Sequence, residues 1–142
     1  MLRRVDVVEI GSPSEHLRLR ADSGDLALDY LLADLSVDGL SATKRVYAHY
    51  ASGWRELAGF FGAMATDWRG WIGTREWSSL ESDLKIEVRH EYGHVQLHVT
   101  LHNAVAGWGN HGWAASADLT LEPGEQLSRV ADAMTELVNR ES

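Results

Sequence analysis

Residues 84–101 alternate between apolar and polar side chains, and this pattern constrains the fold more than any other feature of the sequence. The apolar positions are Leu84, Ile86 and Val88 in a first run and Val95, Leu97, Val99 and Leu101 in a second. A period of two is typical of β-strands with one buried face. A two-residue turn at Tyr92-Gly93 pairs Val88 with Leu97 and places every apolar residue of the first run opposite one of the second. The sequence therefore predicts a hairpin whose register is set by its apolar face.

Two other segments repeat apolar residues every three or four positions, which is typical of helices that bury one face. The first stripe consists of Trp54, Leu57, Ala58, Phe61, Met64, Ala65 and Trp68, and the second of Leu127, Val130, Ala131, Met134, Leu137 and Val138. Ser52 is the predicted N-cap of the first helix, which is expected to end at Arg69, before Gly70. Pro123 and Glu125 suit the start of the second helix.

The remaining strands follow from turn signals. A third strand is expected over residues 113–121, where alternate side chains are again apolar. Asp38-Gly39 is a type I′ turn signal that pairs Leu35 with Ala42 and Leu31 with Val46. Lys44, opposite Ala33, is the one charge on that face. Short strands are also expected over residues 5–10 and 17–21, on either side of a Gly-Ser-Pro-Ser turn.

These elements predict one α+β domain over residues 1–142. Its architecture is expected to be two-layer, with a mainly antiparallel β-sheet and two helices packed on one face. A chain of 142 residues is about the size of a single domain, and the sequence shows no internal repeat or linker. The other face of the sheet is expected to be polar.

Composition argues against several classes of protein. The chain has no Cys, so it has neither disulfides nor thiolate sites. Its net charge of −8 and the lack of a basic stripe argue against a nucleic-acid partner. No stretch approaches roughly 18 consecutive apolar residues, and no apolar segment follows the basic N-terminus, so neither a membrane span nor a signal peptide is expected. The expected location is the cytoplasm.

Seven histidines raise the question of a metal site. His94, His98 and His102 recur every four residues, which on a strand separates neighbours by roughly 13 Å. A single zinc ion cannot bridge them, because its ligand nitrogens lie about 2 Å from the metal. Polar residues on a solvated sheet face are the simpler interpretation, although His49 or His111 could still meet another histidine in space. No metal site and no cofactor are predicted.

The six tryptophans fall into two groups. Trp54, Trp68 and Trp113 lie on predicted apolar faces and are interpreted as core residues. Trp71, Trp77 and Trp108 fall in predicted connections, where an indole either plugs the edge of the core or lines a pocket.

Residues 67–81 form the densest cluster of functional groups, with three indoles, two guanidinium groups and three carboxylates. Three interpretations are open. The segment is a rigid corner in which Arg69 or Arg75 stacks on an indole and pairs with Asp67 or Glu76, or it is a recognition surface, or Glu76 and Glu81 act as an acid–base pair. With the Gly-rich loop of residues 107–112, it supplies the candidate binding residues Asp67, Arg69, Trp71, Arg75, Glu76, Trp77, Trp108 and His111.

Sequence templates for catalysis are missing. The chain has no Gly-x-Ser-x-Gly elbow, no phosphate-binding loop, no dinucleotide-binding glycine motif and no His-Glu-x-x-His. The loop at residues 107–112 joins two predicted strands and so offers no helix N-terminus to a phosphate. No catalytic residue is predicted.

The order of motifs resembles a known family. It combines Asp67-Trp68-Arg69-Gly70-Trp71-x-Gly73, Trp77-x-Ser79-Leu80-Glu81, the turn Tyr92-Gly93-His94-Val95 and the helix entry at residues 119–125. From about Leu35 onward, this pattern is similar to an uncharacterised bacterial family, the domain of unknown function family 6228. The resemblance implies a small bacterial cytoplasmic protein and carries over no activity, cofactor or residue role.

Two functional hypotheses from different classes follow. The first is an acidic, non-enzymatic binding module that recognises a protein partner, for example a basic toxin neutralised by an immunity-type protein. The alternative is a small-molecule-binding protein or enzyme, with Trp71, Trp77 and Trp108 lining a pocket between sheet and helices. In that pocket Glu76, Arg75 and His111 supply the polar groups. The sequence is also compatible with a homodimer.

Overall fold

The computed structural model describes residues 6–22, 28–104, 109 and 111–139. Eight strands and two helices follow one another in these parts of the chain. They are β1 (Val7–Gly11), β2 (His16–Arg20), β3 (Tyr30–Val37), β4 (Leu40–Tyr47), α1 (Arg55–Thr66), β5 (Thr74–Ser78), β6 (Leu84–Glu91), β7 (His94–Asn103), β8 (Trp113–Leu121) and α2 (Glu125–Val138). The protein therefore has an α+β fold.

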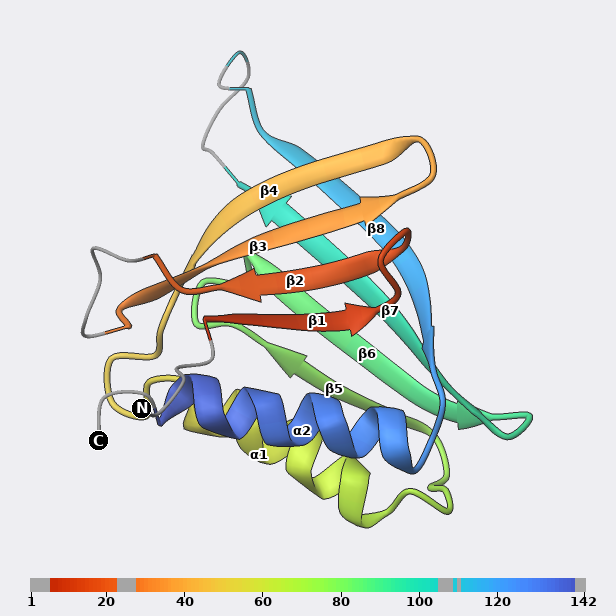
Figure 1. Cartoon of the computed structure of the whole chain (residues 1–142). Helices are drawn as coiled ribbons and strands as arrows, with labels where there is room; N and C mark the ends of the chain where they lie inside the picture. The colour runs from red at the N-terminus through yellow and green to blue at the C-terminus, as the bar shows by residue number, and fades with distance from the viewer. Residues whose placement is uncertain (1–5, 23–27, 105–108, 110, 140–142) are drawn as a thin grey trace.

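The strands form two antiparallel sheets, in the orders β1-β2-β3-β4 and β5-β6-β7-β8. The expectation of a single sheet is wrong, because α1 separates two meanders that do not share a hydrogen-bonded edge. In Figure 1 the strands of the first sheet lie in front of the second and run across them at a wide angle. Crossed sheets of this kind bury the inner faces of both.

The apolar positions predicted by alternation form the core between the two sheets. Leu31 and Leu35 of the first sheet and Ile86, Val99 and Leu101 of the second are fully buried. The polar residues that alternate with them on β6 and β7 are exposed or half-buried, as expected for strands with one solvated face.

Both helices lie at the same end of the sheets and pack side by side, with α2 next to β1 (Figure 1). Their buried faces carry the predicted stripes, including Phe61 and Met134. α1 begins at Arg55 rather than after Ser52, and Trp54 occupies its N-cap position without a side-chain cap. The Trp54 indole Nε1 instead donates a hydrogen bond to the carbonyl oxygen of Leu28, at 2.9 Å. No helix in the described ranges has the length and apolar character needed to cross a membrane.

Both predicted hairpin registers are confirmed. In the second sheet Val88 lies opposite Leu97, and in the first sheet Leu35 lies opposite Ala42. The turn type at Asp38-Gly39 is wrong, however, because only Gly39 has a positive φ, whereas a type I′ turn requires one at both positions. At the other hairpin both Tyr92 (φ 53°) and Gly93 (φ 76°) are left-handed.

Lys44 lies on the inner side of β4, opposite Ala33 as predicted. Its Nζ is 3.8 Å from Oδ2 of Asp83, in the loop before β6 of the other sheet. Asp83 is only 7% exposed. The charge that interrupts the apolar pattern of β4 therefore forms an ion pair between the two sheets.

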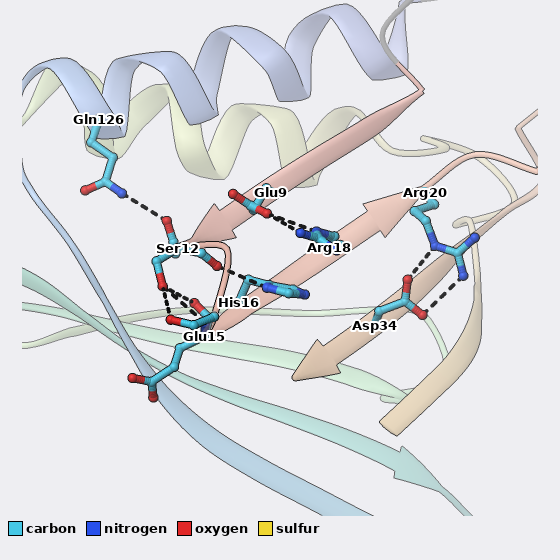
Figure 2. A network of polar contacts seen from close by, with 10 residues as sticks. Glu9, Ser12, Glu15, His16, Arg18, Arg20, Asp34 and Gln126 are labelled. Atoms are coloured by element: carbon cyan, nitrogen blue, oxygen red, sulfur yellow. Dashed lines mark hydrogen bonds and ion pairs between the residues drawn. The ribbon is translucent and has the colours of Figure 1, made fainter. Parts of the chain in front are cut away.

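The outer face of the first sheet carries two ion pairs. Nη2 of Arg18 donates to Oε1 of Glu9 across the β1–β2 hairpin, at 2.7 Å. Arg20 of β2 donates to Asp34 of β3 in the same way (Figure 2). At one end of this sheet, Gln126 of α2 donates to the carbonyl oxygen of Gly11, at 3.1 Å. That contact ties α2 to the β1–β2 turn.

Candidate functional site

The connection between α1 and β5 holds most of the predicted binding residues. α1 ends at Thr66, where the backbone N–H of Asp67 donates to the carbonyl oxygen of Ala63. Gly70 (φ 135°) and Gly73 (φ 83°) then take backbone conformations that other residues adopt only with strain. These glycines give the connection its tight path. Residues 68–73 are called the recognition loop from here on, after the hypothesis that this segment is a recognition surface.

Arg75 supports the base of the recognition loop. Its guanidinium lies 4.6 Å from the centre of the Trp71 ring, and its Nη2 donates to Oδ2 of Asp67, at 2.7 Å. The stacking and the ion pair proposed for the rigid-corner interpretation are therefore both present, and both use Arg75. The arrangement joins the end of α1 to the first residues of β5.

His90 is a member of this corner that the sequence analysis missed. Its Nε2–H donates to the carbonyl oxygen of Trp68, at 3.0 Å, and its ring meets Trp71 edge-on, with centroids 5.4 Å apart. A Cβ at Gly70 would lie 3.4 Å from Nδ1 of His90, so the loop passes close over the imidazole. The sequence does indicate that His90 faces inward, because it continues the alternation of Ile86 and Val88 along β6.

The indole ring of Trp71 is packed in this corner, but its N–H group lacks a hydrogen-bond acceptor among the described residues. The ring packs against the core, and the Nε1 atom is buried. A buried donor without an acceptor costs about 1–3 kcal/mol. The contacts of Arg75 and His90 therefore have to offset this cost to keep the recognition loop in its conformation.

The outer residues of the recognition loop point into solvent. Ile72 is fully exposed, at 104% relative accessibility, and Trp68 is 45% exposed. The guanidinium of Arg69 lies 5.2 Å from the centre of the Trp68 ring. Trp68 was predicted to lie in the core, which is wrong, because α1 ends two residues earlier and the indole leaves the helical stripe.

Glu76 and Trp77 lie on opposite faces of β5, a strand that the sequence analysis treated as a connection. Trp77 faces inward, packs against the core and lies 6.4 Å from Trp54 between ring centres. Glu76 faces outward, and one of its carboxylate oxygens is 3.7 Å from Nζ of Lys85. An exposed carboxylate with a lysine partner lacks the burial that acid–base catalysis by paired carboxylates requires.

Of the remaining candidates, His111 is exposed just before β8, and within the described residues no hydrogen bond or ion pair joins it to this corner. Trp108 lies outside the described residues, so its predicted role stays a prediction. Trp113, expected in the core, is 37% exposed at the start of β8.

A shallow cavity of about 340 Å³ lies on the outer face of the second sheet, where a polar surface was expected. Arg89 and His98 line it with polar residues of neighbouring strands, and both have partners. Nε of Arg89 donates to Oγ1 of Thr74, at 2.7 Å, and His98 Nδ1 lies 2.7 Å from Oδ1 of Asp118. Within the part of the chain that the structure describes, no three metal-ligating side chains cluster.

Comparison with known proteins identifies the family and nothing further. The model of a family of unknown function, DUF6228, matches residues 8–141, so the chain belongs to this family. The match begins well before Leu35, where the resemblance seen in the motifs started. No curated protein and no solved structure matches.

Proposed function

We propose that this member of a family of unknown function is a non-enzymatic binding module that recognises a protein partner through the recognition loop. The observation that carries the proposal is the exposure of Ile72 and Trp68 on a loop whose base is fixed by Arg75 and His90. A large aliphatic side chain in water gives nothing to folding, but it contributes apolar area when a partner covers it.

The residue types on the loop support a protein rather than a small molecule as the ligand. Trp and Arg are enriched among the residues that dominate binding energy at protein interfaces. Trp68 and Arg69 are exposed beside each other, and Ile72 projects rather than lining a concave pocket. Because the base of the loop is fixed, little conformational entropy is lost on binding.

Charge favours a basic partner. The net charge of −8 attracts a positively charged protein and increases its association rate, and added salt screens this attraction. A basic toxin held in the cytoplasm by an immunity-type protein would be one such partner. Under this proposal the association rate falls as ionic strength rises.

Site-specific photo-crosslinking in cells tests the proposal. A photoreactive amino acid replaces Ile72 in one variant and Tyr50 in the control, because Tyr50 is also strongly exposed (87%) but lies at the other end of α1. The proposal predicts a defined protein adduct at position 72 that Trp68→Ala removes and that position 50 does not form. Equal adducts at both positions, or none at position 72, would contradict it.

A further inference from the structure

The four edge strands of the two sheets differ in how they are protected against pairing with another chain. β1 and β5 have five residues each, and β1 is flanked by α2. β4 carries Lys44 and Arg45, and Lys44 points inward. Short length, edge charges and inward-pointing charges are the features by which natural sheets avoid edge-to-edge pairing.

β8 lacks these features over its first half. It has nine residues, and the five from Trp113 to Ala117 include no charged residue and no proline. Within the described residues, β8 pairs with β7 alone. The second half is better protected, because Asp118 and Thr120 share a small cavity with Gly11 and Ser12 of the β1–β2 turn.

We infer that the first half of β8 binds a second copy of this chain, strand against strand, across a two-fold axis near Ala115. Two copies of one strand edge are self-complementary in antiparallel pairing, and a two-fold contact uses the same residues from both chains. In the dimer, the β5-β6-β7-β8 sheets of the two copies then become one continuous eight-stranded sheet.

The side chains fit this register. With the axis at Ala115, Trp113 of one copy lies opposite Ala117 of the other, so that a half-exposed indole covers a small residue. Ala114 lies opposite Ser116 on the outer face, and both are exposed and small. Asp118 lies opposite Gly112, which keeps the two carboxylates from facing each other across the ladder.

The position of this edge leaves the recognition loop free. Trp113 pairs with Asn103 at the end of β7, whereas His90 and the recognition loop lie near the start of β7, at the other end of the second sheet (Figure 1). Two copies that each carry a charge of −8 repel one another, so added salt strengthens the dimer. Salt has the opposite effect on the association with a basic partner.

Sedimentation equilibrium of the full-length protein with paired charge variants tests the inference. Wild type is expected to reach twice the 15.8 kDa mass of one chain as its concentration rises, and to do so at lower concentration in high salt. The double variant Ala114→Glu/Ser116→Glu places like charges opposite each other twice and should be monomeric, as should Ala114→Lys/Ser116→Lys. A mixture of the two variants should form a heterodimer.

A matched control makes the same change in net charge as the lysine variant at another edge. Asp38→Asn/Ser41→Lys changes two exposed residues at the turn and outer face of the β3–β4 hairpin and should dimerise as wild type does. Circular dichroism and the melting temperature establish that each variant is folded. A wild type that stays monomeric at its highest soluble concentration, or a dimer that persists in both β8 double variants, would overturn the inference.

Discussion

The guanidinium of Arg75 lies between the ring of Trp71, 4.6 Å from its centre, and the carboxylate of Asp67, 2.7 Å from Oδ2. Trp71 belongs to the recognition loop, and Asp67 is the C-cap residue directly after α1. A single side chain of β5 therefore fixes the loop to the helix. The exposed residues Trp68 and Ile72 are presented from this fixed base, which is the basis of the proposed function.

Removal of the Arg75 side chain should make the recognition loop more mobile and should change the stability of the whole protein only a little. Arg75→Ala is expected to lower the free energy of unfolding by about 1 kcal/mol. The substitution removes a partly exposed ion pair and a stacking contact with Trp71, and each of these stabilises a folded protein only weakly at an exposed site. Hydrogen exchange of the amides of residues 68–73 should become faster. Arg69→Ala, which removes an exposed guanidinium, should leave both measurements close to wild type.

The ion pair between the sheets should matter more for stability. Lys44→Ala leaves the buried carboxylate of Asp83 without its cation and is expected to cost about 3 kcal/mol in urea unfolding. Lys44→Met combined with Asp83→Asn removes both charges and should recover most of that loss. A cost below about 1 kcal/mol for Lys44→Ala would mean that water solvates Asp83 well.

Acid should weaken the first sheet through Asp34. Partial burial alone raises the pKa of Asp34, but hydrogen bonds from Arg20 and Thr43 outweigh it and hold that pKa below its usual 3.8. The stabilisation by the ionised carboxylate is therefore complete above pH 3.8 and is lost as the pH falls through the lower pKa of the folded state.

Asp34→Asn provides the measurement. The substitution should cost about 1 kcal/mol at neutral pH, since the partner Arg20 is itself partly exposed. The difference from wild type in the free energy of unfolding should shrink as the pH is lowered below 3.8. A difference that stays constant over this range would contradict the assignment to the ionised carboxylate.

The hairpin tip offers a stabilising substitution. Tyr92 is 94% exposed and has a left-handed backbone (φ 53°), which a residue with a large side chain adopts at a cost. Tyr92→Asn should therefore raise the free energy of unfolding by about 0.5–1 kcal/mol, with a matching rise in melting temperature. Asp38→Asn, at a turn position without a positive φ, should change neither value appreciably.

The hairpins were predictable from the sequence because their registers depend on local information. A two-residue turn and an alternating pattern leave one pairing in which Ile86 meets Val99. The division into two sheets was not predictable in this way. Whether β5 extends the first sheet or starts another depends on how the α1 connection folds, and no local pattern records that. β5 itself was missed because its outward residues and Arg75 are all polar.

The site was predictable in its chemistry and less so in its geometry. The pairing of an arginine with Asp67 and an indole follows from the residue types present between Asp67 and Trp77. Which residues are exposed depends on where elements end, and α1 ends two residues before Trp68. The inward position of His90 could be predicted from the alternation of β6, but its contact with the recognition loop could not, because the two segments meet only in the folded protein.

The affinity of the crosslinked partner for purified variants tests the central claim most directly. Isothermal titration calorimetry compares wild type with Ile72→Ser, Trp68→Ala and the exposed control Tyr50→Ser. The account predicts that Ile72→Ser and Trp68→Ala each weaken binding by about tenfold or more, equivalent to about 1.4 kcal/mol, while Tyr50→Ser binds as wild type does. Equal affinities for all four proteins would contradict the assignment of the recognition loop as the binding surface.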